Sequence, residues 1–331
     1  MAENKEVQPR VSVIVPVYRT EPYLERCCRS LFGQTLQEVE YLFVLDGPSA
    51  EAEAIIRRTL TDFPLRKKWL RIIGHEQNRG VSRCRQEGHD LARGQYLFHC
   101  DSDDWMAVEA LEKLYAKAVA EGAELVFADY VRHYPSSGRE VVYSAEYVLR
   151  GGISTMDGTL CNKLISLELV QDNDLRFPEG INWGEDMVMS VLLQIFARKT
   201  AYLPQVFYHY CMRSDSLTQA LDAEKYMQLV SCPAYVERVL SQRGQAESHQ
   251  MLLMQMKFEV KEYFLIHRAL RNVKKWQTIY PECHAYIWQY GSVPLYLKCV
   301  SALASHRLSI LAWAMLQCRD GYVWVRDHIV R

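Results

Sequence analysis

A short acidic segment from Gly94 to Trp105, with the sequence GQYLFHCDSDDW, holds the residues best suited to chemistry. Apolar residues from 96 to 100 predict a β-strand that leads directly into Asp101 and Asp103. Side chains two residues apart in an extended chain share a face, so the two carboxylates can point together. Such a pair suits a divalent cation that also binds substrate phosphates. The alternative is a solvated acidic turn that caps the next helix, since Asp is common at both positions.

Buried strands alternate with helical segments through the first 130 residues. Strands are expected at 11–15, 41–45, 70–73, 96–100 and 125–130, with helices over 24–31, 50–63, 81–92 and 108–119. The first strand reads VSVIV, a continuous β-branched run typical of a parallel strand buried on both faces, and is expected to end at Pro16. This alternation predicts an α/β fold with a doubly wound, mostly parallel sheet. Ligands bind at the carboxyl ends of such strands, where the acidic segment begins.

The pattern changes after residue 130. Residues 135–138 read PSSG between apolar flanks, which predicts a hairpin or an edge strand over 131–143. From residue 222 onward the pattern is helical, and we expect a boundary near residue 218. Aromatic and basic residues dominate from 286 to 331, against only Asp320 and Asp327. This composition fits a helical tail on an anionic membrane surface, and it equally fits an aromatic helical core with a solvated face.

Composition excludes several classes of protein. The 331 residues are 49% hydrophobic and carry a net charge of −1, so there is a sizeable core and no basic excess of the kind that nucleic-acid binding requires. The ten cysteines include no C-x-x-C pair, which predicts reduced thiols and a cytoplasmic location. The polar start MAENKEVQPR predicts no secretory signal, and no apolar run approaches the ~20 residues of a membrane span.

Several segments match a known family in order and spacing. They are VSVIVPVY at Val11, Asp46 after the second strand, NRGVSRCRQEG at Asn78, the DSDD segment, CNK at Cys161 and GED at Gly184. Together they resemble the bacterial family 2 glycosyltransferases, inverting enzymes of the GT-A fold, over residues 11–216. Independent short matches in one chain rarely line up in order by accident.

The resemblance implies a role for each matched residue. Pro16, Val17, Tyr18 and Asp46 would hold the nucleotide base. Arg85 would bind the diphosphate and Asp101 the ribose, Lys163 would lie near the sugar phosphate or the acceptor, and Arg213 would belong to a loop that closes over the diphosphate. Asp101 and Asp103 would hold Mn²⁺ or Mg²⁺, and Asp186, beside Glu185, would be the catalytic base. Simpler interpretations remain: Asp46 as a turn residue, Lys163 as a solvated lysine, and Glu185–Asp186 as acids that complement a helix dipole.

The resemblance also implies an organisation and a function. Residues 1–130 would be the nucleotide-sugar-binding half of a GT-A domain, 131–218 its acceptor-binding half, and 219–331 a helical region. The expected activity is metal-dependent transfer of a hexosyl or N-acetylhexosaminyl group from a UDP-sugar to a glycan or lipid-linked acceptor in cell-surface polysaccharide synthesis. The C-terminal helices could contact the inner face of the cell membrane. The alternative is a non-catalytic nucleotide-sugar-binding subunit of the same fold, whereas a dinucleotide-dependent oxidoreductase lacks its G-x-G-x-x-G segment here.

Overall fold

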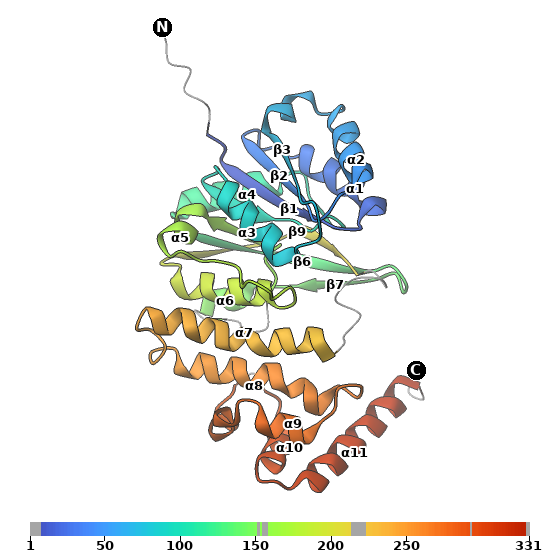
Figure 1. The fold of residues 1–331 in the computed structure, drawn as a ribbon, viewed down its shortest axis with the longest axis vertical. Coiled ribbons are helices and arrows are strands. Elements are labelled where there is room, and N and C mark those ends of the chain that lie inside the picture. Colours follow the sequence, from blue (N-terminus) through green and yellow to red (C-terminus); the bar gives the residue numbers. More distant parts are fainter. Residues whose placement is uncertain (1–7, 151–152, 154–157, 213–222, 292, 329–331) are drawn as a thin grey trace. The chain divides into compact units, whose positions relative to one another are not determined.

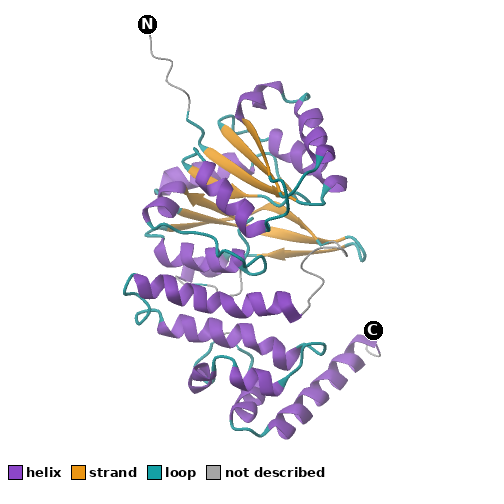
Figure 2. Ribbon diagram, viewed as in Figure 1, coloured by secondary structure: helices purple, strands orange, loops and turns teal. Residues whose placement is uncertain are grey.

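The computed structural model describes residues 8–150, 153, 158–212, 223–291 and 293–328. The chain divides into two compact units, Met1–Leu221 and Asp222–Arg331. Every described strand belongs to the first unit, and the described elements of the second are helices (Figures 1 and 2). The expected boundary near residue 218 lies outside the described residues, and the expected division at residue 130 falls inside a strand. The proposed roles of these parts therefore remain predictions.

The first unit is built on a nine-stranded sheet in the order β3-β2-β1-β4-β8-β6-β9-β5, with β7 paired to β6. The parallel pairs are β1 with β2 and β4, β2 with β3, and β6 with β9, whereas β8, β5 and β7 join antiparallel. The strands are β1 (Val11–Val17), β2 (Val39–Leu45), β3 (Leu70–Gly74), β4 (Tyr96–His99), β5 (Trp105–Met106), β6 (Leu125–Tyr134), β7 (Arg139–Tyr143), β8 (Lys163–Ser166) and β9 (Thr200–Cys211).

The helices of the first unit connect these strands. They are α1 (Glu21–Phe32), α2 (Ala50–Leu60), α3 (Val81–Leu91), α4 (Ala110–Glu121), α5 (Leu167–Asp172) and α6 (Glu185–Phe196), with short 3₁₀ helices η1 (Pro64–Trp69) and η2 (Glu146–Arg150). The predicted α/β alternation through residue 130 is confirmed, and so is the hairpin, which is formed by β6 and β7.

The first strand is longer than expected. It continues through Pro16 to Val17, and Pro16 is paired with Val44 of β2. Proline cannot donate a hydrogen bond, which normally excludes it from a central strand. Here β4 pairs with β1 only as far as Ile14, so by residue 16 one side of β1 no longer has a strand partner that needs this donor.

The carboxyl half of the sheet departs from a simple alternating pattern. Strand β8 lies between β4 and β6, although it follows β6 and β7 in the chain. Strand β9 runs parallel to β6 over nine paired positions, with shifts of register on both sides of Asp129. Strand β5 adds only two residues beside β9. These pairings bring the segment after β4 against the end of β9.

Close packing of α3 on β1 depends on one small residue. Gly88 faces Ile14, and a Cβ at position 88 would lie 2.3 Å from the Ile14 Cγ2 atom. The helix can therefore lie directly against the strand. This approach sets the height of α3, and hence of Arg85, above the carboxyl end of the sheet.

The second unit contains α7 (Ala223–Gln242), α8 (Gln250–Ile266), α9 (Val273–Thr278), η3 (Pro281–Tyr286), α10 (Leu295–Ser305) and α11 (Ser309–His328). Met254 and Met256 are buried among its apolar residues and form part of its core. Within the helices that the structure describes, no stretch is both long and apolar enough to span a bilayer.

Candidate active site

The acidic segment leaves β4 as a turn that β9 fixes from the other side. The Tyr208 hydroxyl donates to Asp104 Oδ2 at 2.7 Å and accepts from the Asp101 backbone N–H at 3.0 Å. Asp104 Oδ1 also accepts from the Cys211 backbone N–H at 2.7 Å, and Asp104 is only 1% exposed. Asp104 therefore holds the turn against β9. The turn does not cap the next helix through Asp104, because α4 does not begin until Ala110.

The loop after β1 and helix α1, which follows it, hold the same turn from the opposite side. The hydroxyls of Thr20 and Ser102 lie 2.7 Å apart, and the Arg26 guanidinium donates to the Asp103 carbonyl oxygen at 2.8 Å. The guanidinium of Arg26 also lies 3.7 Å from the centre of the Trp105 ring. Contacts from the β1–α1 loop, from α1 and from β9 thus hold the turn in place.

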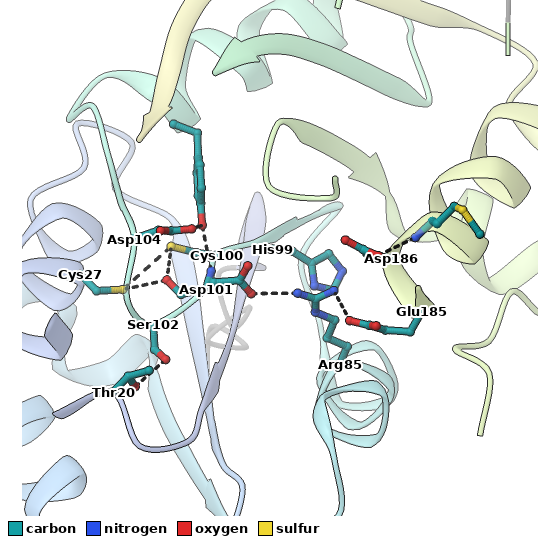
Figure 3. A network of polar contacts seen from close by, with 12 residues as sticks. Thr20, Cys27, Arg85, His99, Cys100, Asp101, Ser102, Asp104, Glu185 and Asp186 are labelled. Atoms are coloured by element: carbon teal, nitrogen blue, oxygen red, sulfur yellow. Dashed lines mark hydrogen bonds and ion pairs between the residues drawn. The ribbon is translucent and has the colours of Figure 1, made fainter. Parts of the chain in front are cut away.

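Arg85 joins this turn to the predicted catalytic pair. It donates to Asp101 Oδ1 at 2.8 Å and to Glu185 Oε1 at 2.9 Å (Figure 3). Arg85 comes from α3, Asp101 from the end of β4, and Glu185 from the first turn of α6. Arg85 is 6% exposed and Glu185 5%, whereas the Asp101 side chain is 32% exposed. The three residues, with Asp186 adjacent to Glu185, form one polar cluster, which we call the Asp101–Arg85–Glu185 bridge.

Burial and charge oppose each other within this cluster. Burial raises the pKa of Glu185 to about 8, although Arg85 acts to lower it. Burial also raises the pKa of Asp186; Arg85 and Lys163 counteract this effect, and the negative charge of Asp101 adds to it. For Arg85, burial alone would lower the pKa, but Asp101 and Glu185 outweigh it and raise the pKa, so the guanidinium stays charged. Asp101 and Asp186 therefore lie within electrostatic reach of each other.

Two buried histidines lie in the same region as Arg85. His89 Nε2 and His99 Nε2 are 2.9 Å apart, and the Phe177 ring packs against both imidazoles. Burial, with the charge of Arg85, lowers the pKa of His89 to about 3, and burial also lowers that of His99. Both rings are therefore neutral at pH 7. Sequence reasoning did not single them out, because a histidine in an apolar strand such as YLFH carries no distinctive spacing.

Asp46 is fully engaged at the end of β2. Its Oδ1 accepts from the Arg79 backbone N–H at 2.7 Å and its Oδ2 from the Gly80 N–H at 3.0 Å. His75 Nδ1 lies 3.1 Å from the same Oδ1, and His75 Nε2 lies 2.6 Å from a Glu87 carboxylate oxygen. Asp46 thus positions the start of α3, and its role at a nucleotide base remains a prediction.

Asp46, His75 and Cys84 form a group of potential metal ligands among the residues described. One ligand atom from each lies within 4.8 Å of the others. Burial raises the pKa of the Cys84 thiol, which opposes the thiolate that a metal requires, and the Asp46 oxygens already accept backbone hydrogen bonds. We interpret this group as a hydrogen-bonded support for α3. The carboxylates of Asp101 and Asp103 are a more suitable donor set for a hard cation, because such cations prefer oxygen ligands.

The remaining predicted residues divide into three cases. Pro16 and Val17 end β1, and the Tyr18 ring that follows is 39% exposed. Lys163 is buried in β8, where its Nζ donates to Asn162 Oδ1 at 2.9 Å and to the Thr159 carbonyl oxygen, so the solvated-lysine interpretation is wrong. Arg213 lies outside the described residues. The structure therefore brings Arg85, Asp101, Glu185 and Asp186 together and leaves Arg213 without a described position.

Residues 12–170 match the family model described as Glycosyl transferase family 2. A relative from Bacillus subtilis, described as putative glycosyltransferase EpsH, is 25% identical over 282 residues, which cover 82% of this chain and 78% of that protein. The chain spans 47% to 78% of the length of the first three curated relatives.

Solved structures share the fold. The S. aureus TarS 1–349 structure in complex with UDP-GlcNAc matches with a TM-score of 0.65 and 18% identity, over 94% of this chain and 92% of that one. A mannosyltransferase from Pyrobaculum calidifontis, in complex with GDP-Man and Mn²⁺, matches with a TM-score of 0.51 and 14% identity, over 98% of this chain and 88% of that one. At these identities the likeness establishes the fold alone. Residues 12–170 of this chain thus match glycosyl transferase family 2, within a fold of the GT-A type.

Proposed function

We propose that this protein is a metal-dependent, inverting glycosyltransferase that transfers a sugar from a UDP-sugar to a hydroxyl group of a glycan or lipid-linked acceptor. The observation that carries the proposal is the Asp101–Arg85–Glu185 bridge. It joins a strand-end carboxylate, a buried guanidinium and an acidic pair at a helix start within one cluster. Leaving-group stabilisation and proton removal would thus be available side by side.

The donor would bind at the carboxyl ends of β1 and β4. Asp101 and Asp103 would hold Mn²⁺ or Mg²⁺, which supplies Lewis-acid stabilisation of the diphosphate leaving group. The fork of donors on Arg85 suits diphosphate oxygens, with Arg213 as a second cation and Lys163 as a buried charge nearby. Pro16, Val17, the exposed Tyr18 ring and Asp46 would contact the base. The GDP-Man and Mn²⁺ complex of a protein with this fold is consistent with such a metal.

Asp186 would remove the proton from the acceptor hydroxyl, with Glu185 beside it. Burial raises the pKa of Asp186, which makes it a stronger proton acceptor than an ordinary surface aspartate. One base and no enzyme nucleophile implies direct displacement, which inverts the configuration at the anomeric carbon. We further propose a hexosyl or N-acetylhexosaminyl donor and a role in cell-surface polysaccharide synthesis at the inner face of the membrane. The UDP-GlcNAc complex of a related fold is consistent with this donor class.

The decisive experiment compares Asp186→Asn with wild-type protein in UDP release from a panel of UDP-sugars. A positioned base contributes about 10²–10⁴-fold in rate, so we expect a loss of that size with UDP-sugar binding retained. Asp62→Asn is the matched control, since Asp62 is an exposed carboxylate on another segment of the same unit. Transfer by Asp186→Asn at the wild-type rate would refute the base assignment.

Two further measurements separate the remaining parts of the proposal. Asp103→Asn should weaken UDP-sugar binding with Mn²⁺ and leave metal-free binding unchanged; equal binding under both conditions would contradict the metal site. The anomeric configuration of the product, read by NMR, tests inversion. A wild-type protein that binds UDP-sugars and neither hydrolyses nor transfers them with any acceptor would instead support the non-catalytic subunit.

A further inference from the structure

A basic pocket lies between the start of α3 and the segment that leads into α6. It encloses a volume of ≈ 260 Å³ and is lined by three arginines and several uncharged polar side chains: Arg79, Arg83, Arg176, Ser82, Gln86 and Asn182, with Phe177, Glu179 and Gly180. None of these residues is needed for the proposed chemistry. We call this site the arginine pocket.

The walls of the arginine pocket are held by hydrogen bonds between its two segments. The Ser82 hydroxyl donates to the Pro178 carbonyl oxygen at 2.7 Å, and the Ser82 N–H donates to Asn182 Oδ1 at 3.2 Å. Gln86 Oε1 accepts from the Phe177 backbone N–H at 2.9 Å. The pocket is therefore a defined cavity in which the exposed arginines meet a fixed polar wall.

The charges in the arginine pocket are unbalanced. Arg176 pairs with Asp174 at 2.8 Å and lies 3.6 Å from Asp90. Arg79 and Arg83 form no ion pair with a carboxylate among the residues described, and Glu179 is the single acid in the lining. Two guanidinium groups without carboxylate partners favour a doubly charged anion, and their forks of donors match phosphate oxygens.

The arginine pocket is separate from the predicted donor site. Ser82, Arg83 and Gln86 line it, whereas Arg85 of the same helix points to Asp101 and Glu185. Its volume is below the roughly 300–1,000 Å³ of pockets that enclose whole small-molecule ligands, so it suits a phosphate group with a few attached atoms rather than a nucleotide sugar. One wall continues from Asn182 to Gly184 and Glu185 within the same segment. A bound anion would therefore lie against the segment that leads to the predicted base.

We propose that the arginine pocket binds a phosphate ester that is not part of the donor nucleotide. This inference rests on the proposed function in one respect: if the protein is a glycosyltransferase, the phosphate belongs to the acceptor. The acceptor would then be an anionic molecule, with its phosphate held by Arg79 and Arg83 and its hydroxyl presented toward Asp186.

The test is calorimetric titration of the full chain with glycerol 3-phosphate, inorganic phosphate and glycerol, in the presence of saturating UDP. We expect glycerol 3-phosphate to bind and glycerol not to bind. The variant Arg79→Gln/Arg83→Gln should bind glycerol 3-phosphate at least about tenfold more weakly, since hydrogen bonds to charged groups are among the strongest. Arg57→Gln/Arg58→Gln removes two exposed arginines from α2 and should bind like wild type.

Three results would overturn the inference. They are wild-type affinity in Arg79→Gln/Arg83→Gln, displacement of glycerol 3-phosphate by UDP, and inorganic phosphate binding as tightly as the ester, which would indicate a free-anion site. UDP binding is measured first, because it tests the proposed glycosyltransferase function independently of the arginine pocket. If UDP does not bind, the proposed function fails, while the comparison of the two double variants without UDP still decides the arginine pocket.

Discussion

Replacement of Arg85 by methionine would leave Glu185 as a buried carboxylic acid with no cation beside it. The two side chains now meet at 2.9 Å, and both are almost fully buried. Asp101, the other partner, is 32% exposed and can regain hydration, so the penalty falls mainly on Glu185. Removal of one member of a buried ion pair typically costs about 3–5 kcal/mol when the remaining charge stays ionised.

The pH dependence of this loss has a defined sign. The pKa of Glu185 is about 8 with Arg85 present, and it rises further without Arg85, because the arginine lowers it. A carboxyl with a raised pKa in the folded state favours folding at low pH, and this contribution is lost as the pH rises through the folded-state value. At pH 6 Glu185 is protonated in both proteins, so the difference in stability is small. Above pH 8 Glu185 ionises in the wild-type protein and stays protonated in Arg85→Met. The difference in stability between the two proteins therefore grows by up to about 1.4 kcal/mol per pH unit, until Glu185 also ionises in the variant.

Differential scanning calorimetry of the intact chain at pH 6 and pH 9 is the assay, because the two units can melt as separate transitions. A unit of this size loses about 2–4 °C in Tm per kcal/mol, so a full loss of 3–5 kcal/mol corresponds to a fall of about 6–20 °C. One pH unit above a pKa of about 8 adds about 1.4 kcal/mol, so Arg85→Met should lower Tm by about 3–6 °C more at pH 9 than at pH 6, and the full range would be reached only at higher pH. Adding Glu185→Gln should remove the pH dependence.

Arg29→Met is the matched control. Arg29 also bridges two carboxylates, Glu25 at 3.0 Å and Asp62 at 2.9 Å, but its side chain is 49% exposed. Exposed ion pairs contribute little to stability because water screens them, so Tm should change little at either pH. The reasoning fails if Arg85→Met and Arg29→Met destabilise equally, if the loss for Arg85→Met is the same at pH 6 and pH 9, or if the double variant keeps the pH dependence.

Three other predictions follow from the same contacts. Tyr208→Phe should destabilise the first unit by about 1–3 kcal/mol in urea unfolding, because it leaves an Asp104 oxygen and the Asp101 N–H unpaired. Tyr115→Phe is the control: it removes an exposed hydrogen bond and should leave stability nearly unchanged. Gly88→Ala should lower the free energy of unfolding by about 1–3 kcal/mol, because the added Cβ clashes with Ile14. Gly74→Ala is the control, since nothing lies within 4 Å of its added Cβ, and equal destabilisation by the two variants would contradict the packing argument. The acid limb of kcat/KM against pH should lie above 3.8, the ordinary pKa of aspartate, because burial raises that of Asp186; a limb at or below that value would contradict its role as the base.

Most secondary structure of the first 130 residues followed from local pattern. Runs such as VSVIV and YLFVL consist of consecutive apolar residues, and this pattern predicts buried strands. The buried residues of the helix between them recur every three or four positions, which predicts a helix. Strand β8 escaped prediction because four residues, KLIS, carry too little periodicity. Strand β9 was not predicted either, because its end, YHYC, mixes polar and aromatic residues, and its pairing with β6 and β5 makes it a strand.

By itself, the sequence determined the α/β alternation, the acidic turn after β4 and the family, since each is written in neighbouring residues or in the order of short segments. Only the tertiary structure decided what those residues contact. Arg85 reaches Asp101 and Glu185 across 16 and 100 positions of the chain, Tyr208 reaches Asp104 across 104, and Ser82 reaches Asn182 across 100. A hydrophobic run indicates that a strand is buried, but it does not indicate which strand lies beside it. Strand order is set by packing among distant segments, and the bridge and the arginine pocket exist only once that order is formed.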